Sequence, residues 1–339
     1  MKKYNNLYNH LETAYSMSID ELIEKLKIEI PTVVSSFYIE KKNGDSRKIY
    51  QVKKDSLTWN VQKFLNNFYF SKIILPECAY GFKKGKSYFD FLEYHVSNGL
   101  ESSFLKLDIK DFFSSIKVDK LVTRLVPEFE KNAEKSKVIT DLFIVILSFD
   151  DQIPQGFQTS PFLSNYYFFR ADLRIQKYCN KLDYKYSRYA DDIILSSTDN
   201  EKLISNRTIA MIGNIVNDFH LQLNKQKTRI SKKELALNGF VISSEIRLSQ
   251  KKLKELRRVI FIINQCKKQD NIIQKLNSDK NGNEKNKKRD FTKNYLLDYL
   301  SGSRSFLISS LKNTNEHSSW HKKAEKLING IEKSILKVY

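Results

Sequence analysis

The sequence is short of cysteine. Its 339 residues include three, Cys78, Cys179 and Cys266, and they lie far apart along the chain. An odd number at such spacing argues against a disulfide framework and against a cysteine-based metal site. We therefore expect reduced thiols, as in a cytosolic protein.

Long hydrophobic runs are also missing. No stretch approaches the roughly 18 consecutive apolar residues that indicate a membrane span. The opening "MKKYNNLYNHLETAYSMS" has two lysines but no apolar segment after them, so we do not expect a secretory signal. Hydrophobic residues still make up 41% and aromatic residues 12%, which excludes a disordered chain and leaves length for two or three domains or one elongated molecule.

Acidic residues are scarce relative to basic ones. The chain has 39 Asp and Glu against 58 Lys and Arg, a formal charge of +19. From residue 251 to the end there are 21 basic and 9 acidic residues. A field this one-sided favours a polyanionic partner, and nucleic acid is favoured over membrane because no lipid-inserting helix accompanies it. The charge alone leaves open a generally lysine-rich proteome.

The periodicity of apolar residues predicts mixed helices and strands. Residues 1–36 are predicted helical, with Asp20 as an N-cap, and alternating runs on either side of Asn43-Gly44 predict a β-hairpin. Further helices are expected over 56–73 and 117–149. The stretch 153–179 opens with a Pro-Gly loop and continues as a long helix, and two strands meet at Asp191-Asp192. From Ser249 the pattern is helical and basic, interrupted by a polar stretch at 279–290 that we expect to be a flexible loop. Because the strands and helices do not alternate regularly, the expected class is α+β with a helical C-terminal domain.

Two acidic positions point to chemistry. "SRYADDIILSS" sets Asp191 and Asp192 between two strand-like runs, and "LKLDIKDFFSSI" ends an apolar strand at Asp108. A lone strand-end Asp is usually a cap, and Asp also tolerates turns. If the two strands are neighbours, however, the carboxylates meet at one sheet edge. Such a site suits Mg²⁺, and a pair of these ions would bind and stabilise the attacking and leaving oxygens of a phosphoryl transfer.

With these residues in place, a family resemblance emerges. "YADD" at 189–192 resembles the central motif of reverse transcriptases, "LDIKDFF" their first catalytic motif and "IPQGFQTSPFLSN" the motif between them. "LNKQKT" and "LNGFVIS" are similar to the two motifs that follow. "SRKIYQ", "YGFKKGKS" and His95 in "YFDFLEYH" resemble the fingers of bacterial retron-type enzymes. The ordered blocks cover roughly residues 35–266, and the remainder resembles the thumb of that family in length and character.

The resemblance implies a right-hand polymerase. Residues 1–107, with part of 117–160, would form N-terminal helices and fingers, residues 108–248 a ferredoxin-like palm, and residues 249–339 a basic helical thumb. Asp108 and Asp191 would be catalytic metal ligands, Asp192 the third carboxylate, and Ile109 a ligand through its backbone carbonyl. The cofactor would be two Mg²⁺ ions, for which Mn²⁺ could substitute.

The resemblance also implies a nucleotide site. Arg47 would hold the triphosphate, unless it is a solvated hairpin charge, and Gln155 and Gly156 would line the pocket. Lys227 would lie near the departing pyrophosphate, and its spacing from Asn224 favours it over Lys225. Phe113 stands where the family has an aromatic that blocks a 2′-hydroxyl and so selects dNTPs. The alternative is that Phe113 is a core residue beside Phe112, since only one of the pair can point each way.

The C-terminal helix expected from Ser249 to Lys267 carries the remaining candidates. Its Leu and Ile residues share one face, and its basic residues would grip the phosphates of a template–primer duplex. The basic candidates are Lys252, Lys254, Arg257 and Arg258.

The sequence departs from the retron pattern at three places. Phe91-Leu92 stand where retrons usually have Asn-Ala, Leu237-Asn238-Gly239 where they have Val-Thr-Gly, and Gln158-Thr159 where small residues or proline are common. Both a divergent retron enzyme and a related defence-associated reverse transcriptase fit these departures.

The expected function is an RNA-directed DNA polymerase that copies a structured noncoding RNA into cDNA from dNTPs, in the bacterial cytoplasm and in antiphage defence. No nuclease cluster follows the last motif, so a host ribonuclease H would remove the template. An effector protein, a second polymerase subunit and oligomerisation stay open, and no membrane is expected. The alternatives are an RNA-templated RNA polymerase, which Phe113 disfavours, and an RNA-binding scaffold with a polymerase-like fold, which retention of the motif residues disfavours.

Overall fold

The computed structural model describes residues 6–40, 44–97, 100–198, 205–266, 270–278, 290–312 and 314–339. The chain divides into two compact units. The first comprises residues 1–87, 105–195 and 204–229, and the second residues 88–104, 196–203 and 230–339. The loop expected at 279–290 lies outside the described residues except for Asp290. The boundaries of fingers, palm and thumb remain predictions.

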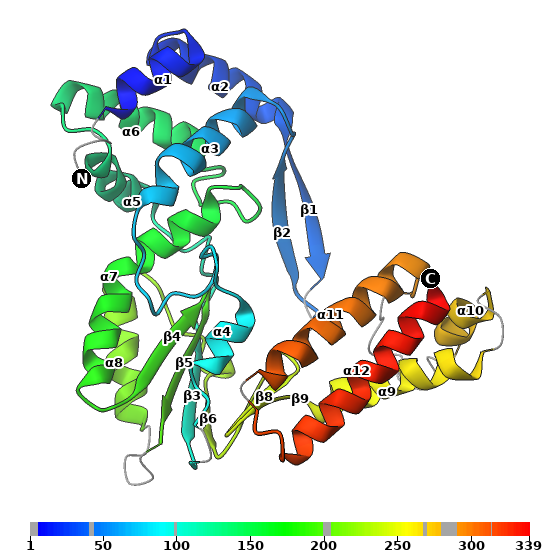
Figure 1. Cartoon of the computed structure of the whole chain (residues 1–339). Helices are drawn as coiled ribbons and strands as arrows, with labels where there is room; N and C mark the ends of the chain where they lie inside the picture. Colours follow the sequence, from blue (N-terminus) through cyan, green and yellow to red (C-terminus); the bar gives the residue numbers. More distant parts are fainter. Residues whose placement is uncertain are drawn as a thin grey trace. The chain divides into compact units, whose positions relative to one another are not determined.

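The first unit contains a group of helices that lie together in Figure 1. They are α1 (Leu7–Tyr15), α2 (Ile19–Val33), α3 (Leu57–Phe68), α5 (Val118–Leu125) and α6 (Ala133–Leu147). Many of their apolar residues, among them Leu26 and Phe143, are buried in one hydrophobic core. The predicted N-cap of α2 was wrong by two residues. The hydroxyl of Ser18 accepts the Glu21 amide there, whereas Asp20 lies in the first turn.

The predicted hairpin is confirmed. Strands β1 (Val34–Glu40) and β2 (Ser46–Val52) pair in antiparallel register, with Ile39 opposite Arg47, and Figure 1 shows the hairpin extending away from α2 and α3. Its base is held by the loop that precedes α7 (Ser160–Asn180). The Tyr50 amide donates to the Gln155 carbonyl at 2.7 Å, and the Tyr50 hydroxyl donates to Asp150 at 2.9 Å.

A four-stranded sheet has the order β4-β5-β3-β6. These strands are β4 (Lys185–Tyr189), β5 (Asp192–Ser197), β3 (Ser103–Asp108) and β6 (Arg229–Lys232). Helix α7 packs against β4 and against α8 (Asn206–Asn217), and both helices flank the sheet in Figure 1. Because Leu105, Leu107, Ile193 and Leu195 are all fully buried, the two central strands are fixed in the core.

The second unit is mainly helical. It contains α4 (Tyr88–Glu93), α9 (Gln250–Gln265), α10 (Asp270–Ser278), α11 (Lys293–Leu311) and α12 (Ser319–Val338), and α11 lies along α12. A small antiparallel sheet joins β7 (Leu235–Leu237), β8 (Phe240–Ile242) and β9 (Ile246–Leu248). Short 3₁₀ turns elsewhere are η1 (Phe70–Lys72), η2 (Val126–Glu128) and η3 (Lys225–Lys227). Helices and strands are mixed without regular alternation, which confirms the α+β class.

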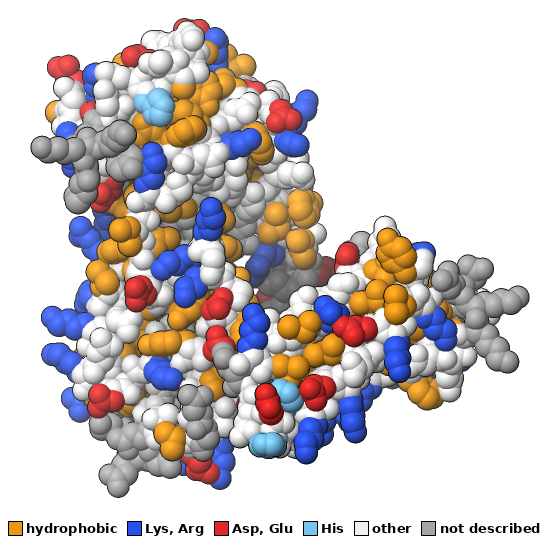
Figure 2. Space-filling view, viewed as in Figure 1, with side chains coloured by type: hydrophobic (Ala, Val, Ile, Leu, Met, Phe, Trp, Pro, Cys, Tyr) orange, Lys and Arg blue, Asp and Glu red, His pale blue; other side chains and the backbone are white. Residues whose placement is uncertain are grey.

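The three cysteines are buried and unpaired, as the sequence predicts. Among the described residues, no helix is both long and apolar enough to cross a membrane. In Figure 2, Lys and Arg side chains are spread over the face shown of both units, in keeping with the excess of positive charge.

Candidate active site

The three predicted carboxylates come together at one edge of the sheet in the first unit. Asp108 is the last residue of β3 and Asp192 the first residue of β5, and β3 and β5 are neighbours. Asp191 lies in the turn between β4 and β5, where its carbonyl accepts the Ile109 amide at 3.0 Å. The condition that the sequence left open, that the two strands be adjacent, is therefore met.

Two lysines neutralise part of this acidic group. Lys106 Nζ lies 2.8 Å from an Asp192 carboxylate oxygen and 3.8 Å from an Asp108 oxygen, and its side chain is only 12% exposed. Lys227 donates to both carboxylate oxygens of Asp108 at 3.1 Å. Asp108 itself is buried. Two of the three carboxylates, Asp108 and Asp192, are thus held in ion pairs, which offset the cost of removing their charges from water.

Asp191 is a buried carboxylate close to two other acidic residues. Burial raises its pKa above the ordinary value for Asp, and the negative charges of Asp192 and then Asp108 raise it further. Its own backbone amide and the positive charge of Arg47 act in the opposite direction. A cation placed at this edge would relieve the repulsion.

The chemistry of these donors fits Mg²⁺. Hard carboxylate oxygens beside a backbone carbonyl are ligands that Mg²⁺ accepts, and it commonly binds through one or two carboxylates together with substrate phosphates. In the part of the chain that the structure describes, no three His, Cys, Asp or Glu side chains are already arranged to hold an ion. In this arrangement Lys106 and Lys227 engage the oxygens of Asp192 and Asp108.

Three of the residues predicted for the nucleotide site, Arg47, Gln155 and Gly156, lie on β2 and in the loop before α7. Arg47 is exposed on β2, and its charge influences Asp191. Gly156 has φ of +115°, and a Cβ there would lie 2.0 Å from the Tyr50 carbonyl oxygen. The close approach that requires this glycine is therefore to the hairpin of the chain itself. Nucleotide binding by Arg47, Gln155 and Gly156 remains a prediction.

The two phenylalanines after Asp108 have different surroundings. Phe112 is buried, with its ring near Phe168 and beneath the guanidinium of Arg188. Phe113 is half-buried and meets Phe82 edge to face, with ring centroids 6.2 Å apart. Phe112 is therefore the core residue of the pair, and Phe113 stays available for the predicted steric gate.

The four basic candidates on α9 also differ. Lys252, Lys254 and Arg257 are exposed, and Arg258 is half-buried. The Lys252 ammonium lies 3.9 Å from the centroid of the Phe240 ring, and its methylene carbons pack where Gly239 lacks a side chain. Lys254 and Arg257 are thus the strongest candidates for contacts with phosphate, a role that remains predicted.

Two of the residues that depart from the retron pattern, Phe91 and Leu92, are fully buried in the second unit. His95, also buried, shares a 2.7 Å hydrogen bond with the Ser196 hydroxyl.

Sequence reasoning missed two basic residues near the carboxylates. Lys106 precedes Asp108 by two residues, so both side chains fall on one face of β3, and that spacing was a usable signal. Arg188, three residues before Asp191, is fully buried with Asp172. Nothing in the sequence around Arg188 indicates this partner, because Asp172 lies 16 residues earlier, on helix α7.

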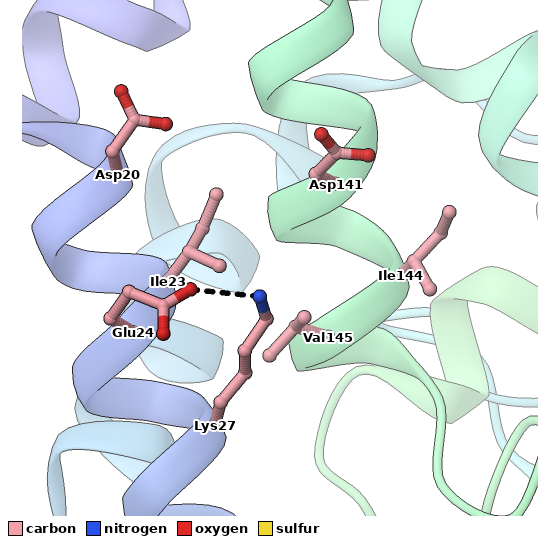
Figure 3. A pocket seen from close by; sticks show the side chains of 7 residues that line it. All are labelled: Asp20, Ile23, Glu24, Lys27, Asp141, Ile144 and Val145. Atoms are coloured by element: carbon pink, nitrogen blue, oxygen red, sulfur yellow. Dashed lines mark hydrogen bonds and ion pairs between the residues drawn. The ribbon is translucent and has the colours of Figure 1, made fainter.

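A separate depression lies between α2 and α6 (Figure 3). It measures about 350 Å³, and Lys27 on its wall pairs with Glu24 at 2.8 Å. Asp20 and Asp141 give the remaining wall a negative charge, which does not suit a nucleic acid or a nucleotide. None of the predicted site residues lines it.

Comparison with known proteins gives the class. The family model described as reverse transcriptase (RNA-dependent DNA polymerase) matches residues 39–242, more than half of the chain. The chain belongs to the reverse transcriptase family and has the right-hand polymerase fold of that family, with a helical thumb. Enzymes of this family use divalent metal ions.

Individual relatives are named more specifically than the family. The chain is 34% identical over 201 residues to the retron Ec73 reverse transcriptase of Escherichia coli, covering 56% of this chain and 62% of that protein. It is 27% identical over 235 residues to the retron Se72 reverse transcriptase of Salmonella heidelberg (strain 579083-10), covering 67% of this chain and 59% of that protein. The predicted retron-type resemblance is confirmed. The chain spans about six tenths of the length of these two relatives.

A solved structure of telomerase from Candida albicans, in complex with a fragment of telomeric RNA, is also similar. The match covers 95% of this chain and 66% of that one, at 12% identity and a TM-score of 0.45. A likeness this remote carries no argument about function.

Proposed function

We propose that this protein is an RNA-directed DNA polymerase. The observation that carries the proposal is the convergence of Asp108, Asp191 and Asp192 at one sheet edge, inside a chain of the reverse transcriptase family. Such a convergence costs electrostatic free energy, as the raised pKa of Asp191 reflects. A site for divalent cations and phosphates explains why the fold tolerates that cost.

The residues of the chain would divide the work of nucleotidyl transfer. Asp108, Asp191 and the Ile109 carbonyl would hold Mg²⁺, which when bound lowers the barrier by stabilising the attacking and leaving oxygens. Lys106 orients the Asp192 carboxylate, and Lys227 lies close enough to Asp108 to reach a phosphate there. Arg47 would hold the triphosphate by its planar guanidinium.

The selection of substrate would come from Phe113. Its half-buried ring, braced by Phe82, would exclude the 2′-hydroxyl of a ribonucleotide by contact alone. Gln155 and Gly156, at the base of the hairpin, would line the same pocket.

A second part of the proposal concerns the biological setting of this reaction. Its support is the similarity to retron reverse transcriptases over the catalytic region. We propose a structured noncoding RNA as template, bound by the basic helices of the second unit, and a role in bacterial antiphage defence. A host ribonuclease H would remove the template, and an effector protein would complete the system.

A primer-extension assay tests the catalytic proposal. The purified protein would be given a primed RNA template and Mg²⁺, with dNTPs or rNTPs in parallel reactions. We expect DNA synthesis that requires Mg²⁺ and that is lost in Asp108→Asn. Preferred incorporation of rNTPs would indicate an RNA polymerase, and equal synthesis by the Asn variant would refute the assigned site.

A further inference from the structure

A buried polar network lies directly beneath the turn that carries Asp191. Arg188, at the end of β4, is fully buried, and its Nη2 and Nε bind the two oxygens of Asp172 on α7 at 2.6 and 2.9 Å. Asp172 is also fully buried and accepts the Tyr186 hydroxyl at 2.6 Å. Burial raises the pKa of Tyr186, so its hydroxyl remains a hydrogen-bond donor.

The third nitrogen of the guanidinium reaches the turn itself. Arg188 Nη1 donates to the Ala190 carbonyl at 3.0 Å and to the Asn165 side-chain oxygen at 3.1 Å. Ala190 has φ of +55°, a left-handed conformation that costs a non-glycine residue about 1–2 kcal/mol. The guanidinium therefore contacts the strained residue that immediately precedes Asp191.

The segment that contains Gly81 packs against the same turn. The Asn165 amide donates to the Gly81 carbonyl at 2.8 Å. A Cβ on Gly81 would lie 2.5 Å from the Ala190 nitrogen, so this segment passes against the turn with no room for a side chain. Hydrogen bonds from the Tyr80 amide to the Arg188 carbonyl and from the Arg188 amide to the Cys78 carbonyl, both 2.8 Å, hold it there.

Stability alone does not explain this arrangement. Taking an ion pair fully out of water carries a desolvation cost, and well-packed apolar residues of similar volume are often as stable or more stable. What apolar residues cannot supply is a donor for the Ala190 carbonyl. We propose that Arg188, held by Asp172 and Asn165, is a positioning residue that fixes the strained turn and thereby places Asp191.

The proposal rests on the proposed polymerase function, and it is tested with two readouts. Arg188→Met/Asp172→Leu removes both charges together, so no ion is left buried without its partner. The first readout is the single-turnover rate of nucleotide addition by the full chain at saturating dNTP, together with KM for the dNTP. The second is hydrogen exchange of the Ile109 amide in metal-free protein labelled with ¹⁵N-isoleucine, because that amide donates to the backbone carbonyl of Asp191.

We expect the double variant to fold, to lose roughly 10²-fold in rate with little change in KM, and to exchange the Ile109 amide faster than wild type. Glu29→Gln is the matched control for lost stability. Its carboxylate accepts the Leu57 and Thr58 amides at 3.0 and 2.7 Å, in another part of the core. It should lower the melting temperature without lowering the rate.

A wild-type rate in the double variant would overturn the proposal. So would Ile109 exchange no faster than in Glu29→Gln, compared at equal distance below each melting temperature. Arg188→Lys serves if the double variant does not fold, because its single ammonium cannot bind Asp172 at two points and also reach Ala190. The same two losses are expected there, and wild-type values would refute the role. The exchange readout holds even if wild type makes no DNA, an outcome that would sink the proposed function instead.

Discussion

Each carboxylate of the candidate site has a different environment, and this difference sets its expected behaviour. Asp108 pairs with Lys227, and Asp192 pairs with Lys106. Asp191 has a raised pKa caused first by burial and then by its acidic neighbours. It is therefore the residue whose charge should cost the most folding free energy when no cation is bound.

The first prediction concerns stability and activity in Asp191→Asn. A carboxylate whose folded pKa lies above its unfolded value loses stability as pH rises through that interval, because the unfolded chain binds fewer protons there. In metal-free buffer at pH 7 the variant should therefore melt at or above the temperature of wild type. This advantage should vanish below the ordinary pKa of Asp. DNA synthesis should fall on the order of 10³-fold or more.

The predicted melting behaviour of Asp191→Asn is measured by thermal melts at several pH values. Asp298→Asn is the control, because Asp298 is exposed. A variant that melts well below wild type at pH 7 would contradict the electrostatic account. Persistent Mg²⁺-dependent synthesis would contradict the catalytic one.

The second prediction concerns Phe113. Replacing it with Val should raise the ratio of rNTP to dNTP incorporation by about 10-fold or more, since each factor of ten requires only about 1.4 kcal/mol of repulsion to be removed. Phe112→Leu, which changes the buried ring instead, is the control and should leave the ratio near that of wild type. If Phe112→Leu moves the ratio and Phe113→Val does not, the gate lies elsewhere.

At the residue scale, the site residues that could be predicted from the sequence are those that lie within its recognisable motifs. Asp108 and the Asp191-Asp192 pair were singled out because two strand-like runs carry acids at their ends in a strongly basic chain, and their roles came from the family resemblance. Arg188–Asp172 was not found, since residues 16 positions apart on a strand and a helix share no periodicity. The N-cap of α2 was placed at Asp20 because Asp caps helices well, but Ser18 was two residues away and equally suited.

At the scale of elements, the hairpin β1–β2 depends on the loop before α7. Gly156 has a positive φ and touches the Tyr50 carbonyl, so the loop and β2 can approach only because the side chain is absent. Arg47 lies three residues from Tyr50 on the same strand. The position of the predicted triphosphate contact therefore depends on this glycine.

The third prediction follows from that contact. Gly156→Ala should lower the melting temperature and raise KM for dNTPs, because its Cβ would displace β2. Gly85→Ala is the matched control, since Gly85 also has a positive φ, +76°, and a Cβ there would meet no atom within 4 Å. It should show only the cost of the backbone conformation, about 1–2 kcal/mol. Equal effects of the two substitutions on stability and KM would mean that the hairpin is not held by this approach.

Most elements could be predicted because their signals are local. The hairpin at Asn43-Gly44 and the helix beginning after Ser249 each follow from a short stretch of sequence. The strand order β4-β5-β3-β6 could not be read in this way, because hydrogen-bond partners far apart in sequence leave no periodic trace. The adjacency of β3 and β5 therefore stayed a condition at the sequence level, although the family resemblance implied that Asp108 and Asp191 share one metal site.

At the scale of the whole molecule, the excess of positive charge is the main property. It amounts to +19, and α9 presents exposed Lys254 and Arg257. Phosphate contacts release counterions, so binding to nucleic acid should depend steeply on salt. The basic residues of α9 are expected to contribute to that dependence unequally, because Lys252 is packed over Phe240.

The fourth prediction is that Lys254→Ser/Arg257→Ser weakens RNA binding and flattens the slope of log affinity against log salt by up to about 0.9 per lost contact. Lys25→Ser/Lys27→Ser on α2 removes the same charge from residues that pair with Glu21 and Glu24, and should leave the slope unchanged. Synthesis on a saturating primer–template should survive in both variants. Equal slopes in the α9 variant and wild type would identify these residues as a solvated surface without a partner.

The most direct test of the central claim is to sequence the nucleic acid that copurifies with the protein after expression with its neighbouring genomic DNA. If the protein copies a structured RNA, wild type should carry one defined RNA together with DNA complementary to part of it. Asp108→Asn should carry the same RNA without that DNA. Complementary DNA in equal amount with both proteins, or RNA of random sequence with no DNA in wild type, would contradict the account.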